Sequence, residues 1–139
     1  MPDLNTLIRV LNHAGFLAFP EFAGCLNPLP NKGCFVTLAA ACSKGDAPLR
    51  TGSGFVIPLI CQLRVRVHAG VRQDIRALAE QVQAILLTQL AAEQCNVHAV
   101  QRGEIRYGKP DDRLSIEYQI TVKGLLICTQ GEDLHADFN

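Results

Sequence analysis

Residues 63–68 read Leu-Arg-Val-Arg-Val-His, and this strict alternation decides the fold. A β-strand turns successive side chains to opposite faces, so the pattern predicts a strand over Phe55–Ala69 with an apolar face and a basic face. Pro58, near the start of this run, indicates an edge position or a bulge, because proline cannot donate a hydrogen bond within a sheet.

A long amphipathic helix is predicted directly after this strand, from about Val71 to Glu93. Apolar residues recur there at three- and four-residue steps, which is the spacing of one helix face. Two further strand-like runs follow, Val97–Tyr107 and Arg113–Ile127, and turn-forming residues 108–112 separate them. The second run alternates from Leu114 to Lys123, so one of its faces is expected to be buried and the other wet.

The N-terminal segment predicts one more helix and then an irregular stretch. Apolar residues at positions 4, 7, 8 and 11 form one stripe, which predicts a helix over Asp3–Ala14. The Asp3 side chain is expected to cap its start, and Gly15 to end it. Phe16–Gly33 contains three prolines and is predicted to be a Pro-rich apolar loop, because prolines at that density forbid a long helix and a central strand.

Cys34–Ala41 reads as a further strand, although its continuous apolar character also fits a short buried helix. Ser43–Gly54 is rich in glycine and is expected to be a loop or a hairpin connection. The polar end of the chain, from about residue 129 to 139, is expected to be a flexible tail. The resulting order α-β-β-α-β-β predicts a single α+β domain over residues 1–139, with a mostly antiparallel or mixed sheet and the helices packed on one face.

Composition limits the classes of function. Hydrophobic residues make up 48% of the 139 residues, which is enough for a sizeable core. Charged residues make up only 19%, so the surface is either partly covered by neighbouring copies or polar and uncharged. Thirteen basic and thirteen acidic residues cancel, which argues against a protein that neutralises a nucleic-acid backbone. The chain lacks a membrane-length apolar run and a signal-peptide pattern, so a cytosolic start is expected.

The cysteines are expected to be small buried hydrophobic residues. None of them forms a C-x-x-C pair, and a metal site built on Cys34 or Cys42 lacks the paired spacing of zinc ligands. Without a secretory signal, disulfides are not expected. No metal ion or cofactor is predicted. The six residues are Cys25, Cys34, Cys42, Cys61, Cys95 and Cys128.

Catalytic patterns are weak. Residues 51–54 read Thr-Gly-Ser-Gly, but a phosphate-binding loop would also need a lysine and a following helix. His68 could meet Cys95 or Ser115, but no nucleophile-elbow pattern is present. No catalytic residue is therefore predicted, and the chain is not expected to be an enzyme.

Two alternatives from other classes remain open. The first is a small enzyme or ligand-binding domain with a pocket between sheet and helices, its walls formed by Phe16, Phe19, Phe22 and Tyr118. The second is a dimeric nucleic-acid-binding module that uses a basic stripe formed by Arg64, Arg66, Arg102 and Arg106. Few aromatic residues lie near that stripe, although single-stranded nucleic acid is usually held by interleaved aromatics.

The succession of elements resembles the tail terminator and tail-completion proteins of long-tailed bacteriophages and prophages. A short N-terminal helix and a variable loop region precede the strand at 63–68, the helix at 74–90 and a hairpin that ends in residues 113–122. The resemblance implies a structural virion protein without catalytic residues. Its subunits would form a ring, typically a hexamer, that caps the tail tube at the head–tail junction and contacts the head-side connector.

A ring of this kind needs one patch of each copy to meet a different patch of the next copy. It would assemble in the bacterial cytoplasm, with no membrane partner and no direct nucleic-acid binding. The predicted outer face of the sheet is the candidate, and Arg64 or Arg66 is expected to pair with Glu117 across strands. The candidate interface residues are Arg64, Arg66, Glu117, Gln119 and Lys123 on that face, with Phe19 and Phe22 from the Pro-rich loop.

Overall fold

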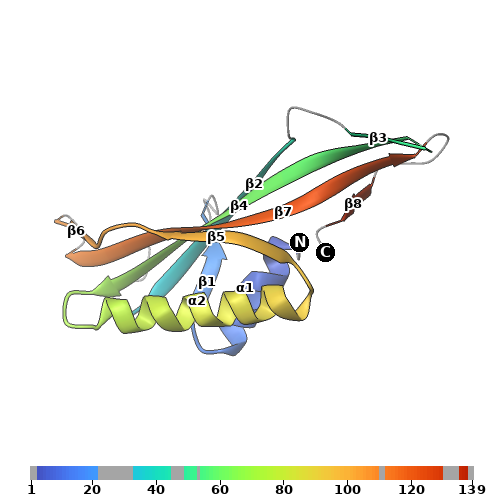
Figure 1. The fold of residues 1–139 in the computed structure, drawn as a ribbon. Helices are drawn as coiled ribbons and strands as arrows, with labels where there is room; N and C mark the ends of the chain where they lie inside the picture. The colour runs from blue at the N-terminus through green and yellow to red at the C-terminus, as the bar shows by residue number, and fades with distance from the viewer. Residues whose placement is uncertain are drawn as a thin grey trace.

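The computed structural model describes residues 3–21, 33–44, 49–52, 54–109, 112–129 and 135–137. These residues form two layers, a long twisted sheet and a pair of helices beneath it (Figure 1). The elements, in chain order, are α1 (Leu4–His13), β1 (Leu17–Pro20), β2 (Phe35–Lys44), β3 (Leu49–Thr51), β4 (Gly54–Gly70), α2 (Ile75–Ala92), β5 (Asn96–Arg102), β6 (Arg106–Gly108), β7 (Arg113–Thr129) and β8 (His135–Asp137).

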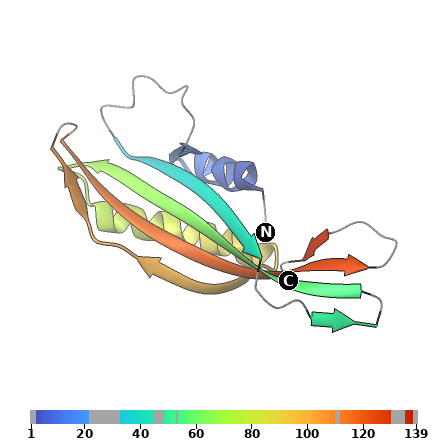
Figure 2. The same cartoon turned by 90° about the horizontal axis from the view of Figure 1, so that it is seen from above.

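The sheet has the strand order β1-β2-β4-β7-β5, with β3 beside β4 and with β6 and β8 beside β7. Only β1 runs parallel to its neighbour β2, and the other described pairs are antiparallel. The central pair, β4 and β7, stays in register over all 17 residues of each strand. Both helices lie on one face (Figures 1 and 2), which confirms the predicted α+β class and mixed sheet.

The core lies between this sheet and the helices. Leu63, Val65 and Val67 of β4 are fully buried, as the alternation in that strand predicts. They face the apolar stripe of α2, and burying each such side chain contributes about 1.5–3 kcal/mol. Tyr118 of β7 lies directly opposite Val65 and is also buried in this layer.

Two predictions about the helix ends need correction. The second helix begins at Ile75 and not near Val71, because Asp74 caps it: the Asp74 carboxylate accepts a hydrogen bond from the Ala77 N–H at 3.3 Å. Gly15 follows α1 with a φ of +97°, a conformation that glycine adopts without strain. The predicted side-chain cap at Asp3 is wrong, because the Asp3 backbone carbonyl accepts from Thr6 N–H at 2.9 Å and the side chain caps nothing.

Four loop and strand predictions need correction. The expected loop Ser43–Gly54 contains the end of β2 and the short strand β3. Leu17–Pro20, expected to be loop, forms edge strand β1, where a proline is tolerated. The predicted strand Val97–Tyr107 is interrupted at residues 103–105, so it forms β5 and β6. The predicted flexible tail contains β8, which pairs with β7. The rest of the loop, from residue 22 to 32, lies outside the described residues, as do residues 130–134 and 138–139 of the tail.

The expectation that no cysteine forms a disulfide is wrong. Cys42 of β2 and Cys61 of β4 are directly opposite each other in the antiparallel pair, with their Cα atoms 4.0 Å apart, and they form a disulfide. Strand register brings them together, and register could not be assigned from sequence. Cys34 and Cys95 are free, and burial raises the pKa of the Cys34 thiol.

Candidate interaction face

The helices leave one face of the sheet uncovered, and the β4–β7 register fixes which side chains lie on it. Arg66 is directly opposite Glu117, and Arg64 is opposite Gln119, so both pairs point to the same side. We call this surface the open face. It comprises Gln62, Arg64, Arg66 and His68 of β4 and Ser115, Glu117, Gln119, Thr121 and Lys123 of β7.

The open face brings together five of the seven predicted interface residues, namely Arg64, Arg66, Glu117, Gln119 and Lys123. Phe19 does not belong to an exposed patch. It is buried, and its ring stacks on Phe35 with 5.6 Å between the centroids. Phe22 lies outside the described residues.

Two arginines and two glutamates form a compact ion-pair network on the open face. Arg66 Nη2 donates to Glu117 Oε1 at 2.9 Å, which confirms the predicted cross-strand pair. Arg64 binds Glu21 Oε2 through Nη2 at 2.5 Å and through Nε at 3.1 Å. Arg64 Nε also lies 3.7 Å from Glu117 Oε1, and Arg66 Nη1 lies 3.8 Å from Glu21 Oε1. The formal charges cancel within the network.

Sequence reasoning missed Glu21, although its side chain is only 16% exposed and lies between the two arginines. It follows β1, and its backbone N–H donates to the Leu38 carbonyl at 2.8 Å, which carries the edge pairing one residue further. The available signal was the two-residue spacing of Phe19 and Glu21, which places both side chains on one face of a strand. The density of prolines around it favoured a loop interpretation.

An aromatic stack lies beside this network. The ring of His68 packs flat on Phe35 with centroids 4.4 Å apart, and the guanidinium of Arg113 lies 4.9 Å above the same Phe35 ring. Arg113 is only 8% exposed, and within the described part of the chain its two terminal nitrogens have no hydrogen-bond partner. Its contact with the ring face is a cation–π interaction, which gains strength when water is excluded.

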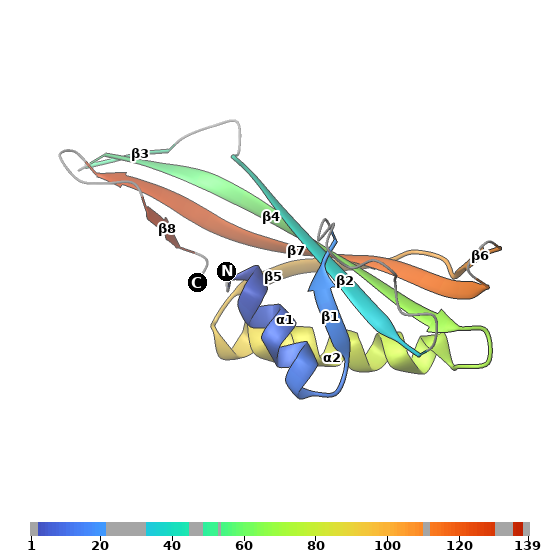
Figure 3. The same ribbon diagram turned by 180° about the vertical axis from the view of Figure 1, so that it is seen from behind.

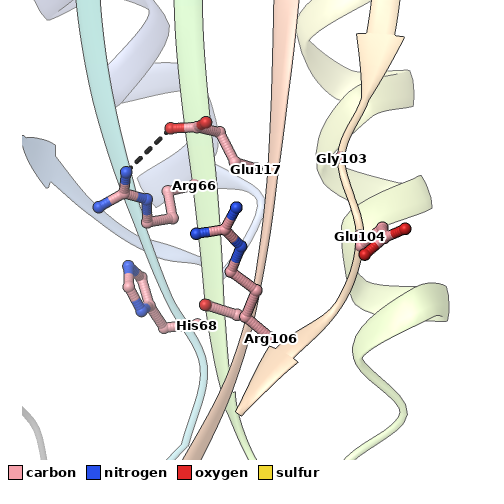
Figure 4. A pocket seen from close by; sticks show the side chains of 7 residues that line it. Arg66, His68, Gly103, Glu104, Arg106 and Glu117 are labelled. Carbon is pink, nitrogen blue, oxygen red and sulfur yellow. Dashed lines mark hydrogen bonds and ion pairs between the residues drawn. The ribbon is translucent and has the colours of Figure 1, made fainter. Parts of the chain in front are cut away.

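A shallow hollow of about 290 Å³ opens on the same face. Figure 4 shows Arg66, His68 and Arg106 beside Glu117 at this point, while the carboxylate of Glu104 lies apart from them. Small-molecule pockets are usually larger and mostly apolar. A hollow with so many charged side chains in its lining suits contact with polar groups of another macromolecule better than an apolar ligand.

The predicted basic stripe is wrong at Arg102. This residue lies opposite Tyr118, on the helix side of the sheet, and its Nη2 donates to Gln83 of α2 at 3.3 Å. A register shift between Val97 and Ala99 is the cause, because a one-residue bulge moves every later side chain of the strand to the other face. Arg106 returns to the open face opposite Ser115.

The four side chains predicted to form one pocket between sheet and helices do not all lie there. Phe16 packs against the helix-side core, and Phe22 lies outside the described residues. Tyr118 is 1% exposed in the helix-side core, whereas Phe19 packs on the opposite side of the sheet with Phe35. Burial raises the pKa of the Tyr118 hydroxyl far above its usual value. The sheet therefore separates Phe19 from Tyr118, two of the side chains that were predicted to line one pocket.

Of the two catalytic pairs considered for His68, the structure brings together only the pair with Ser115. His68 is directly opposite Ser115, but Cys95 follows α2 in the other layer. Among the described residues, no group of three or more His, Cys, Asp or Glu side chains is placed to hold a metal ion. Within the same part of the chain, neither helix is long and apolar enough to cross a membrane.

No protein-family model matches this chain, and a search of curated proteins finds no similar sequence. The arguments below therefore depend on the geometry of the open face and on the element order.

Proposed function

We propose that this protein is a ring-forming structural subunit of the tail terminator or tail-completion type, from a long-tailed bacteriophage or prophage. In this proposal a ring, expected to be a hexamer, caps the tail tube at the head–tail junction of the virion. The ring assembles from copies of the chain in the bacterial cytoplasm and offers a surface to the head-side connector. The protein does no catalysis in this role.

The observation that carries the proposal is the open face. Its charged and amide side chains stand side by side on two central strands, on the side of the sheet opposite α1 and α2. A broad polar surface of this kind resembles a non-obligate protein interface, in which polar groups and bridging water are common. It is less like a small-molecule site, which is concave and largely apolar.

The ion-pair network suits such a contact. Arg64 and Arg66 are about 40% exposed, so each guanidinium can donate to a further partner while it keeps its ion pair with glutamate. Half-exposed pairs contribute only about 0.2–1 kcal/mol each to folding. Their value for an interface lies in holding the guanidinium groups in fixed positions, which reduces the side-chain entropy lost on association.

The element order supports the particular family. A short N-terminal helix, the long strand β4, the helix α2 and an antiparallel pair ending in β7 occur in the order that the resemblance requires. Gene neighbourhood would test this part directly, because genes for a tail tube and a head connector are expected on either side.

Light scattering after size-exclusion chromatography, combined with electron microscopy, tests self-assembly. We expect rings whose mass corresponds to six chains of 15.2 kDa, at least at high protein concentration. A strict monomer at every concentration contradicts the proposal. Lys123→Glu reverses an exposed charge on the open face, and Arg76→Glu makes the same change on the outer side of α2. Only the first should weaken the ring, and equal behaviour of the two variants would remove the open face from the contact.

A further inference from the structure

The alternation of polar and apolar residues stops in both central strands at the same place. β4 alternates from Cys61 to Ala69, but residues 55–60 read Phe-Val-Ile-Pro-Leu-Ile. β7 alternates up to Lys123 and then reads Gly-Leu-Leu-Ile-Cys over residues 124–128. The register places these two apolar runs directly beside each other. Strands with continuous apolar sequence are typical of sheets covered on both faces, whereas alternating strands are covered on one.

Neither helix covers this part of the sheet. We call it the arm, and it consists of β3, residues 54–60 of β4, residues 124–129 of β7, and β8. Figures 2 and 3 show the arm extending past both helices. Phe55 is 47% exposed and Leu125 is 40% exposed, while Val56 and Ile57, on opposite faces, are each only partly buried.

The size of the arm fits the lower end of a specific protein contact. The segments of β4 and β7 each span about 20 Å and the three-residue strands β3 and β8 about 10 Å, so at about 4.8 Å per strand each face offers roughly 300 Å². Both faces together offer roughly 600 Å², about what each partner buries at the lower end of specific interfaces. Between Gly54 and Leu63, β4 has no charged residue, which is typical of the fully buried centre of such a contact.

The opposite end of the molecule offers the matching surface. Five large apolar side chains are exposed among the described residues, and four of them lie at the two ends of the long sheet. Phe55 and Leu125 lie on the arm, whereas Val71 and Tyr107 lie at the far end, beside the β4–α2 turn and on β6 (Figure 1). Leu17, the fifth, lies on the edge strand β1 opposite Phe35, which in turn pairs with His68 close to the far end.

We propose that the arm of one copy inserts against the far end of the next copy, so that sister chains cover both of its apolar faces. This inference rests on the proposed ring function and adds a second subunit contact to the one proposed for the open face. The contact is heterologous, since the arm patch meets a different patch, and repetition of such a contact closes into a ring.

Charge substitutions at exposed positions test this contact without disturbing the core. Phe55→Lys alters the arm and Val71→Lys alters the far end, while Ala84→Lys adds the same charge at an exposed residue in the middle of α2, outside both patches. Each of the first two should raise the concentration at half-assembly by roughly thirtyfold or more, as at interface hot spots. Ala84→Lys should assemble like the unaltered chain. Circular dichroism should show the same folded spectrum for all three.

A mixture of the two interface variants gives the sharpest result. Phe55→Lys keeps an intact far end and Val71→Lys keeps an intact arm, so an equimolar mixture should form dimers and no larger species by native mass spectrometry. Rings formed by Phe55→Lys alone at the concentration of the unaltered chain would overturn the arm contact and leave the ring function standing. A monomeric unaltered chain would instead overturn the ring function together with this contact.

Discussion

Replacing Tyr118 by phenylalanine should stabilise the protein. Tyr118 lies on β7 in the layer between sheet and helices, with 1% of its surface exposed. Its hydroxyl oxygen is buried and has no hydrogen-bond partner among the residues that the structure describes. A buried polar group that lacks a partner costs about 1–3 kcal/mol, because folding removes its water and returns nothing. Phenylalanine keeps the ring and its packing and removes only that group.

The expected gain in the free energy of unfolding is about 1–2 kcal/mol. For a chain of 139 residues, each kcal/mol corresponds to about 3–4 °C in Tm. Tyr107→Phe is the matched control, since the chain has only two tyrosines. The exposed Tyr107 hydroxyl donates to Asp112 Oδ1 at 2.6 Å, so its removal should be neutral or destabilise by less than about 1 kcal/mol. Urea unfolding followed by circular dichroism measures both effects.

Alkaline pH adds a second readout. Burial raises the pKa of Tyr118 in the folded state, so its protonated form is favoured by folding. Stability from this group is fully present below the unfolded pKa of about 10, and above it falls by about 1.4 kcal/mol per pH unit. In Tyr118→Phe that slope should shrink to the contribution of Tyr107, whose pKa the hydrogen bond to Asp112 also raises. The chain has no tryptophan, so tyrosinate absorbance in Tyr107→Phe follows Tyr118 alone. A Tyr118 that titrates near pH 10 while folded, or a Tyr118→Phe protein that melts lower, refutes the reasoning.

Two further substitutions test local features of the fold. Gly103→Ala should destabilise by roughly 1–3 kcal/mol in thermal melts, because its Cβ would lie 2.9 Å from the Glu117 carbonyl oxygen, whereas Gly52→Ala meets no atom within 4 Å and should change little. Equal melting of these two variants would show that the approach of β7 to Gly103 is not close. Asp74→Ala should cost about 1 kcal/mol in urea unfolding through the lost α2 cap, and Asp3→Ala, whose side chain caps nothing, should cost far less. The reverse order would place the working cap on α1.

The repeating patterns allowed the main elements to be predicted. The three- and four-residue spacing found α2, and the alternation in β4 correctly separated Leu63, Val65 and Val67 from the arginines. Those signals depend on one residue and its near neighbours in the same element. Each is therefore complete in the sequence, and the open-face residues of β4 and β7 could be named before the structure was known.

Contacts that depend on register could not be predicted. A bulge between Val97 and Ala99 turned Arg102 to the helix side, and a single-residue slip of β2 against β4 would have separated Cys42 from Cys61. Arg113 lies at the predicted start of its strand, but its stacking on Phe35 joins residues from distant segments. Such contacts are set by the pairing of whole strands, and no local spacing encodes them.

In the arm, the burial expected from the sequence differs from the burial observed in the single chain. Alternating strands were covered on one side, as expected, and the same rule applied to residues 55–60 requires cover on both sides. The helices end before this segment, and Phe55 stays half exposed. Selection for solubility of an isolated monomer would favour polar residues on at least one of these faces. Continuous apolar sequence in two paired strands therefore supports the proposed contact of the arm with a sister chain.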